Sequence, residues 1–401
     1  MESAGSQTRF LILVISLICF IFITFCSRQP SKIDEISMEY EEEYEEEVFI
    51  DPILVLAMEI VSSMDDNLLA AQVLISGVDG NNSLSTHNKN MLTEIPAGGI
   101  MLFRVNLDTN TSTIKSFISQ ISSFITDISD IPPFIAVDHE GGTVNRFSRD
   151  VTTLPSANSY WPLFQSEGIE TAITKIEEDS KKSARDINDL GINMNFAPVA
   201  EHLTDDNRSF LRYRSYGSDL TFTSLAAASF LRGMEENGIL CVVKHFPGSA
   251  GPDPHYSKSE IKSDKDALDI LVTPFAELIK NGARAIMAAH TSVPAIDSEI
   301  ASLSSVVMGN WLRDELGFNG IIISDDFVMA AAGNLKPEEA AVRSIAAGSD
   351  MILVWSPDLR RTHQAILSAL EDGTLPRERL QNAAQRIIYE KIRMGLIDIN
   401  F

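Results

Sequence analysis

Five of the seven histidines lie close to the ends of short apolar segments. His139, His202, His245 and His290 each follow such a segment closely, and His255 lies in the polar stretch after His245. Imidazole transfers protons, orients ligands and binds metals. A single histidine more often has a structural role, but the joint placement of five indicates one functional site.

Charged residues lie at the same segment ends: Asp138, Glu140, Glu201, Lys244, Asp325 and Asp326. Two kinds of hydrolysis need such a set. Metal-dependent hydrolysis needs several His, Asp or Glu ligands around a cation, yet the chain lacks a His-x-His pair on its first segment and any His-Glu-x-x-His sequence. Glycoside hydrolysis needs a carboxylate nucleophile, a proton donor and groups that bind hydroxyls. Asp325, His255 and their neighbours would supply all three.

The apolar segments that position these residues alternate with longer amphipathic stretches from residue 70 onward. Continuous apolar strands are typical of a parallel sheet buried on both faces. Active sites of α/β barrels lie at the carboxyl ends of the strands, where the polar residues fall. We therefore predict an α/β fold, a single (β/α)8 TIM-type barrel, with strands within residues 71–78, 99–105, 134–137, 192–199, 239–243, 285–289, 320–324 and 351–355.

Helical patterns fill the intervals between these segments, and several of them end near a glycine, as helix C-caps do. The pattern predicts helices over residues 112–124, 170–190, 223–236, 267–280 and 306–316, with a closing helix over 378–394.

Composition narrows the range of partners. The chain of 401 residues has 44% hydrophobic and 22% charged residues, which is typical of a globular protein. Its formal net charge of −24 would repel phosphate backbones, so we expect no nucleic-acid partner. Two of the three cysteines lie in the first 26 residues, which excludes a disulfide framework in the barrel.

The N-terminal segment has the character of an export signal. Arg9 precedes an apolar run over residues 10–25 that ends at Cys26. This region resembles a bacterial lipoprotein signal, in which the cysteine becomes lipidated, although Phe25 stands where a small residue is usual. An uncleaved signal anchor and a cleaved signal are the alternatives. All three predict a protein of the bacterial cell envelope, outside the cytoplasm, and the first two predict a membrane anchor.

An acidic stretch follows, with nine Asp and Glu residues between Asp34 and Glu47. Such a like-charged run repels itself and buries no apolar surface, so we interpret it as an extended tether. The expected organisation is a signal or anchor over residues 1–26, a flexible acidic tether over 27–52 and the barrel over 53–401.

Several motifs resemble those of the β-N-acetylhexosaminidase branch of family 3 glycoside hydrolases. The sequences are DHEGGTVNRF at 138–147, KHFPG at 244–248 and SDD at 324–326, with GGIMLF at 98–103, NFAPV at 195–199 and RSYG at 214–217 in the same order. The similarity extends from about residue 53 to residue 396.

The resemblance implies a retaining, exo-acting enzyme that removes terminal β-linked N-acetylglucosamine from peptidoglycan- or chitin-derived oligosaccharides. It makes Asp325 the nucleophile and His255 the acid/base, with Asp253 as its partner in an Asp-x-His dyad. It assigns substrate binding to Asp138, Arg146, Arg214, Lys244 and His245. Histidine suits proton transfer because its unperturbed pKa of ~6.5 lies near neutral pH. The resemblance implies no metal and no cofactor.

Three positions depart from the family pattern. Ser249 and Ala250 replace the His-Gly that usually follows KHFPG, Glu201 replaces an aspartate, and Thr143 stands where arginine is frequent. The loop before Asp253 is also shorter than usual. Two alternative functions therefore remain at this point: an exo-β-glucosidase of the same family, and a catalytically weakened, sugar-binding envelope lipoprotein.

Overall fold

The computed structural model describes residues 51–398 except residues 148, 252, 330–332 and 334. All described residues belong to one compact unit, Ile50–Phe401. The expected signal, Cys26 and nearly all of the expected tether lie outside the described residues. Among those described, no helix is both long enough and apolar enough to cross a membrane.

Eight parallel strands form one sheet in the order β10-β7-β5-β4-β3-β2-β1-β11. Its two edge strands meet through a parallel bridge between Ile323 and Met351, so the sheet is nearly closed as a barrel. The predicted TIM-type barrel is confirmed. The strands are β1 (Leu74–Gly77), β2 (Gly99–Leu102), β3 (Phe134–Val137), β4 (Met194–Asn195), β5 (Leu240–Phe246), β7 (Ala285–Ala288), β10 (Ile321–Ser324) and β11 (Ile352–Val354).

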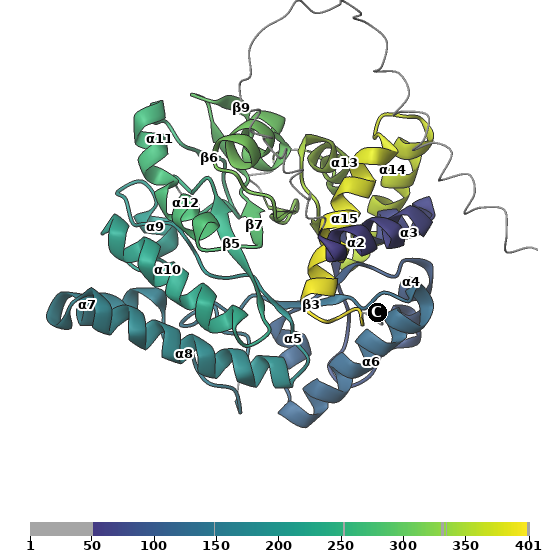
Figure 1. Cartoon of the computed structure of the whole chain (residues 1–401), viewed down its shortest axis with the longest axis horizontal. Helices are drawn as coiled ribbons and strands as arrows, with labels where there is room; N and C mark the ends of the chain where they lie inside the picture. The colour runs from purple at the N-terminus through teal and green to yellow at the C-terminus, as the bar shows by residue number, and fades with distance from the viewer. Residues whose placement is uncertain (1–50, 148, 252, 330–332, 334, 399–401) are drawn as a thin grey trace, which may run out of the picture. The chain divides into compact units, whose positions relative to one another are not determined.

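Helices surround the barrel, and the two N-terminal helices lie beside the C-terminal ones, α2 against α15 and α3 against α14 (Figure 1). The helices are α2 (Pro52–Ser63), α3 (Asp66–Gln72), α4 (Thr86–Glu94), α5 (Arg104–Leu107), α6 (Thr111–Ser129), α7 (Trp161–Glu167), α8 (Ile169–Asp189), α9 (Arg208–Leu211), α10 (Leu220–Glu235), α11 (Lys265–Leu271), α12 (Thr273–Lys280), α13 (Pro337–Ala347), α14 (Leu359–Glu371) and α15 (Arg377–Arg393). A π-helix spans Val306–Glu315, and short 3-10 helices span Ala157–Tyr160, Arg212–Arg214, Ala301–Leu303 and Ser356–Asp358.

Helix α6 illustrates how the sequence builds one β/α unit. The Asn110 side chain accepts a hydrogen bond from the Thr113 amide at 2.9 Å and so caps the first turn. Ile114, Phe117 and Ile121 recur at helical spacing, and all three are buried on one face. The helix thus buries one apolar stripe and connects β2 to β3.

Several predicted elements differ in extent from those observed. Residues 71–72 and 104–105, at the ends of the first two predicted strands, belong to helices α3 and α5. β4 covers only two residues of the predicted segment, because Pro198 has no amide hydrogen for the ladder. β5 continues through Lys244 and His245, whose side chains therefore lie on the strand itself. The predicted helix over 267–280 is two helices, α11 and α12, since Pro274 lies in the first turn of the second.

A second, three-stranded sheet was not predicted. It consists of β6 (Ser259–Glu260), β8 (Thr291–Val293) and β9 (Asp297–Ile300), in the order β6-β8-β9. These strands belong to the connections that follow β5 and β7. They add ordered structure beside the carboxyl ends of those two barrel strands.

Candidate active site

A cavity of about 550 Å³ lies at the carboxyl ends of the barrel strands. Its lining combines charged groups with aromatic rings and includes Phe103, Asp138, Arg146, Phe210, Arg214, Lys244, His245, His255, His290, Asp325, Asp326 and Trp355. This is the end of the barrel at which sites are built in this fold. Seven of the eight predicted catalytic and substrate-binding residues line this one cavity.

Asp138, after β3, connects two cations. Arg146 Nη2 lies 2.6 Å from one carboxylate oxygen, and Lys244 Nζ lies 2.7 Å from the other. Lys244 projects from β5 and is 3% exposed. These pairs bring groups from two strands into one rigid cluster of charges, able to donate to and accept from neighbouring hydroxyl groups.

Glu140 completes this cluster. Arg214 donates two hydrogen bonds to its carboxylate, at 2.9 and 2.8 Å, and Lys244 Nζ lies 2.6 Å away. Burial alone would raise the pKa of Glu140, but the Arg214 and Lys244 cations hold it well below its usual range. Glu140 therefore fixes the positions of two predicted substrate-binding cations.

His245 lies between a carboxylate and a guanidinium group. Its Nδ1 is 2.7 Å from Glu201 Oε1, and its Nε2 is 3.3 Å from Arg214 Nη2. Arginine can only donate, so Nε2 accepts and Nδ1 carries the hydrogen that Glu201 accepts. Glu201 thus orients the ring, and the replacement of aspartate by glutamate at this position preserves a carboxylate contact.

Asp325 directly follows β10 and lines the cavity. Its backbone N–H bonds to the Ala288 carbonyl at 3.1 Å, and its Oδ1 accepts the Asp326 amide at 2.8 Å. Burial opposes ionisation, but His290, His245, the Asp326 amide and Lys244 favour the carboxylate and lower the pKa of Asp325 below its usual value. An ionised, partly buried carboxylate held in one orientation suits a nucleophile.

His290 lies next to Asp325 and was not assigned a role from the sequence. Its Nδ1 is 2.7 Å from Ser302 Oγ, while its buried Nε2 has no hydrogen-bond partner among the described residues. Burial lowers the pKa of His290, while the nearby Asp325 carboxylate acts in the opposite direction. The ring stacks on Phe327, with centroids 4.6 Å apart.

The loop after β5 carries the predicted dyad. Asp253 Oδ1 lies 2.6 Å from His255 Nδ1 and also accepts the His255 amide at 2.9 Å. Burial would raise the pKa of Asp253, but the bonds from His255 lower it below its usual value. The contact leaves Nε2 of the half-exposed His255 ring available toward the cavity that the ring lines.

Among the described residues, no three His, Cys, Asp or Glu side chains are grouped closely enough to hold a metal ion. Cys26, the predicted lipidation site, lies outside the described residues. Glu140, Glu201 and His290 also follow the carboxyl ends of barrel strands, so their position in the sequence marks them even though no role was assigned to them. The stacked pair Phe103 and Trp355 lies within two of the predicted strand segments, and the apolar character of these residues gave no sign of a role in the site.

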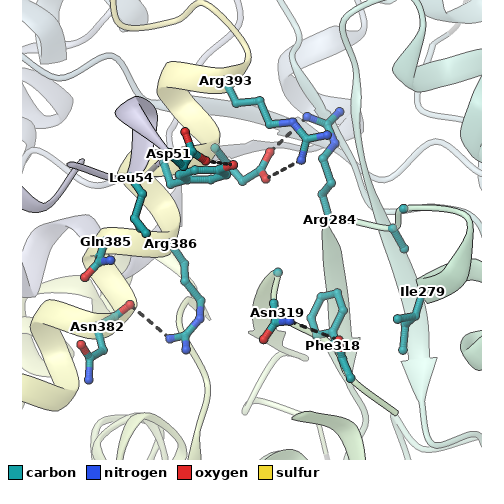
Figure 2. A pocket seen from close by; sticks show the side chains of 16 residues that line it. Asp51, Leu54, Ile279, Arg284, Phe318, Asn319, Asn382, Gln385, Arg386 and Arg393 are labelled. Carbon is teal, nitrogen blue, oxygen red and sulfur yellow. Dashed lines mark hydrogen bonds and ion pairs between the residues drawn. The ribbon is translucent and has the colours of Figure 1, made fainter. Parts of the chain in front are cut away.

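A second cavity, of about 590 Å³, lies at the opposite end of the barrel, where β7 and β10 begin. Figure 2 shows three arginines around it, but their charges are already paired. Arg284 contacts Glu235 and Glu390, Arg393 also contacts Glu390, and Arg386 contacts Asp350. Residues at this end of a barrel generally support the fold rather than catalysis.

Comparison with known proteins identifies the family. Residues 64–389 match the glycosyl hydrolase family 3 N terminal domain. A β-hexosaminidase of Neisseria gonorrhoeae is 33% identical over 320 residues, which cover 78% of this chain and 84% of that protein.

Solved structures agree with this match. NagZ from Neisseria gonorrhoeae, in complex with N-trifluoroacetyl-D-glucosamine, superposes with a TM-score of 0.68 and 30% identity over 79% of this chain and 89% of that one. A family 3 β-N-acetylglucosaminidase from a Paenibacillus strain gives a TM-score of 0.78 and 28% identity over 84% of this chain. The present chain spans 64% of that longer protein. The chain therefore belongs to glycoside hydrolase family 3.

Proposed function

We propose that this enzyme is a retaining, exo-acting β-N-acetylhexosaminidase that removes terminal β-linked N-acetylglucosamine from peptidoglycan- or chitin-derived oligosaccharides. The observation that carries the proposal is the pairing, in one cavity, of the partly buried Asp325 carboxylate with the His255–Asp253 dyad. One group can attack the anomeric carbon, and the other can deliver a proton.

In the first step, an oxygen of Asp325 attacks the anomeric carbon and forms an ester bond to the sugar. The glycosidic C–O bond breaks, and its electron pair passes to the leaving oxygen, which takes a proton from His255 Nε2. Asp253, 2.6 Å from Nδ1, stabilises the imidazolium before transfer and holds the ring in one orientation.

In the second step, His255 accepts a proton from water while the water oxygen attacks the same carbon. The ester to Asp325 breaks, and the carboxylate is restored. Two displacements at one carbon return the β configuration. Proton transfer of this kind typically contributes about 10²- to 10⁴-fold to the rate.

The cluster of Asp138, Arg146, Lys244 and Arg214 binds the hydroxyl groups of the terminal sugar. Ion pairs of 2.6 to 2.8 Å already hold these side chains in place, so they lose little conformational freedom when the sugar binds. Preference for N-acetylglucosamine is supported by the relatives, one named a β-hexosaminidase and another holding a glucosamine derivative.

Two measurements test this activity. Hydrolysis of nitrophenyl-β-GlcNAc should exceed that of nitrophenyl-β-glucose by at least about a hundredfold in kcat/KM, since a site built for a polar substituent rejects a sugar that lacks it. The reverse preference would identify an exo-β-glucosidase, and binding of GlcNAc without turnover would identify a sugar-binding protein. Proton NMR of the first product should show the β anomer. Initial release of the α anomer would exclude a retaining mechanism.

We further propose that the barrel is anchored to the cell envelope, outside the cytoplasm, through lipid on Cys26. The support is the sequence alone: Arg9, the apolar run over residues 10–25 and the cysteine at its end. Labelled palmitate should enter the full-length chain in a bacterial host and be absent from Cys26→Ser. An unlabelled chain that keeps its N-terminus would instead indicate an uncleaved signal anchor.

A further inference from the structure

An aromatic surface forms one side of the cavity mouth, and no step of the proposed reaction uses it. Trp355 follows β11 and stacks on Phe103, which follows β2, with ring centroids 4.8 Å apart and planes inclined by 6°. Both rings line the cavity, and Trp355 remains 42% exposed. An open aromatic face beside otherwise charged groups indicates a surface for an apolar part of a ligand.

Hydrogen bonds hold both rings in place. The indole N–H of Trp355 donates to Asp326. The Phe103 backbone N–H donates to Asn106 Oδ1 at 2.8 Å, and the buried Asn106 side chain donates in turn to two backbone carbonyls. Phe103 also lies over Gly77 of β1, where an added Cβ would come within 3.3 Å of the ring. A surface fixed in this way loses little freedom when a ligand binds.

Relative exposure indicates which part of the substrate this surface faces. Trp355 is 42% exposed, whereas Lys244, in the cluster proposed to bind the terminal sugar, is 3% exposed, and both line the same cavity. In an exo-acting enzyme the terminal sugar is enclosed, and the rest of the substrate extends from it toward solvent. Trp355 therefore lies on the leaving-group side of the scissile bond.

The sheet order separates the aromatic pair from the buried cation Lys244. Lys244, in the cluster proposed to bind the terminal sugar, belongs to β5, and its partner Asp138 follows β3, with β4 between these two strands. β11, β1 and β2 are consecutive in the sheet and carry Trp355 and Phe103. The aromatic pair thus lies on a different part of the mouth from the buried charges.

We propose that Trp355, backed by Phe103, is the binding surface for the leaving sugar, the pyranose ring on the reducing side of the cleaved bond. A pyranose ring presents C–H groups on one face, and these pack against an aromatic face while the hydroxyl groups at its edge stay in water. The inference rests on the proposed function, and it makes Trp355 a specificity residue for oligosaccharides over glycosides with small leaving groups.

The experiment compares two substrates that carry the same terminal sugar. One is the β-1,4-linked GlcNAc disaccharide, and the other is GlcNAc β-fluoride, whose leaving group has no ring. Trp355→Ala should lower kcat/KM on the disaccharide about tenfold and change it less than about twofold on the fluoride. Trp355→Phe, which keeps a flat ring, should retain most of the activity on the disaccharide. Tyr213→Ala removes an exposed aromatic ring that is not part of the cavity lining and should change neither rate.

Two results would overturn the assignment. An equal loss on both substrates in Trp355→Ala would mean that the ring acts on the terminal sugar or on the nucleophile. Unchanged rates on both would mean that the leaving sugar does not contact it. Activity on the fluoride also shows that the variant is folded. If the wild type hydrolyses neither substrate, the proposed function itself fails, which differs from either result.

Discussion

Nδ1 of His245 lies 2.7 Å from Oε1 of Glu201, a residue that is only 1% exposed and does not line the cavity. Glu201 fixes the tautomer and orientation of a ring that also contacts Arg214. Glu201→Gln preserves the size but removes the charge, and we expect kcat/KM on nitrophenyl-GlcNAc to fall about tenfold or more, because one charge-assisted hydrogen bond is lost. Glu201→Asp restores the charge with a shorter reach and should recover part of the loss. Equal activity of wild type and Glu201→Gln would contradict this role.

The dyad predicts a dependence on the leaving group. His255→Ala should lower turnover of the GlcNAc disaccharide by about 10²- to 10⁴-fold. It should slow glycosylation of the enzyme by nitrophenyl-GlcNAc much less, because nitrophenolate leaves with little need for protonation. Azide, which needs no general base, should accelerate the second step in this variant. Asp253→Asn should give a weaker form of the same pattern. Equal losses on both substrates without azide rescue would mean that His255 only shapes the cavity.

Substitution of Asp350 should lower the stability of the fold rather than impair catalysis directly. It is fully buried just before β11 and contacts Arg313 at 2.5 Å, and Arg379 and Arg386 at 3.3 Å. Asp350→Asn leaves three guanidinium groups without their shared charge and should lower the free energy of unfolding by about 3 kcal/mol or more. Glu315→Gln, which breaks the exposed ion pair with Lys265, should cost at most about 1 kcal/mol. Urea unfolding of both variants measures the difference, and similar losses would contradict it.

Lys391 predicts a pH dependence of stability. Burial lowers its pKa from 10.5 to about 7, and its Nζ contacts Gln72 Oε1 at 2.9 Å. Between about pH 7 and pH 10.5, Lys391 is protonated in the unfolded chain and largely neutral in the folded chain. The unfolded chain therefore binds one more proton, and stability rises with pH across this range. From pH 7 to pH 9, wild type should gain about 2 kcal/mol relative to Lys391→Met, as measured by urea unfolding. If the difference in unfolding free energy between wild type and Lys391→Met does not change with pH, Lys391 has its usual pKa in the folded protein.

Much of the fold follows from local sequence. Residues such as 321–323 (Ile-Ile-Ile) and 134–137 (Phe-Ile-Ala-Val) form strands that are buried throughout, because an unbroken apolar run is stable only when both faces are covered. The exact ends of elements depended on proline, as at Pro274 and Pro198. The short strands β6 and β8 escaped prediction since two or three mixed residues carry no periodic signal.

The residues of the site could be predicted from the sequence, but the contacts between them could not. Strand-end position and motif identified Asp138, Lys244 and Asp325, and the Asp253–His255 contact is local in sequence. Arg214 and Glu140 lie 74 positions apart, so nothing in the sequence shows that they form a two-bond ion pair. The stacking of Phe103 on Trp355 joins residues after β2 and β11, which are far apart in the sequence, and it depends on the closure of the barrel.

The central claim is that Asp325 forms a covalent bond to the sugar, and trapping of that intermediate tests it most directly. A 5-fluoro-GlcNAc derivative with a good leaving group should accumulate as a glycosyl-enzyme, because the fluorine slows its hydrolysis. Peptide mass spectrometry should find the added mass on Asp325, and Asp325→Asn should acquire none. A label on Asp326 or on any other residue, or a labelled Asp325→Asn variant, would contradict the account.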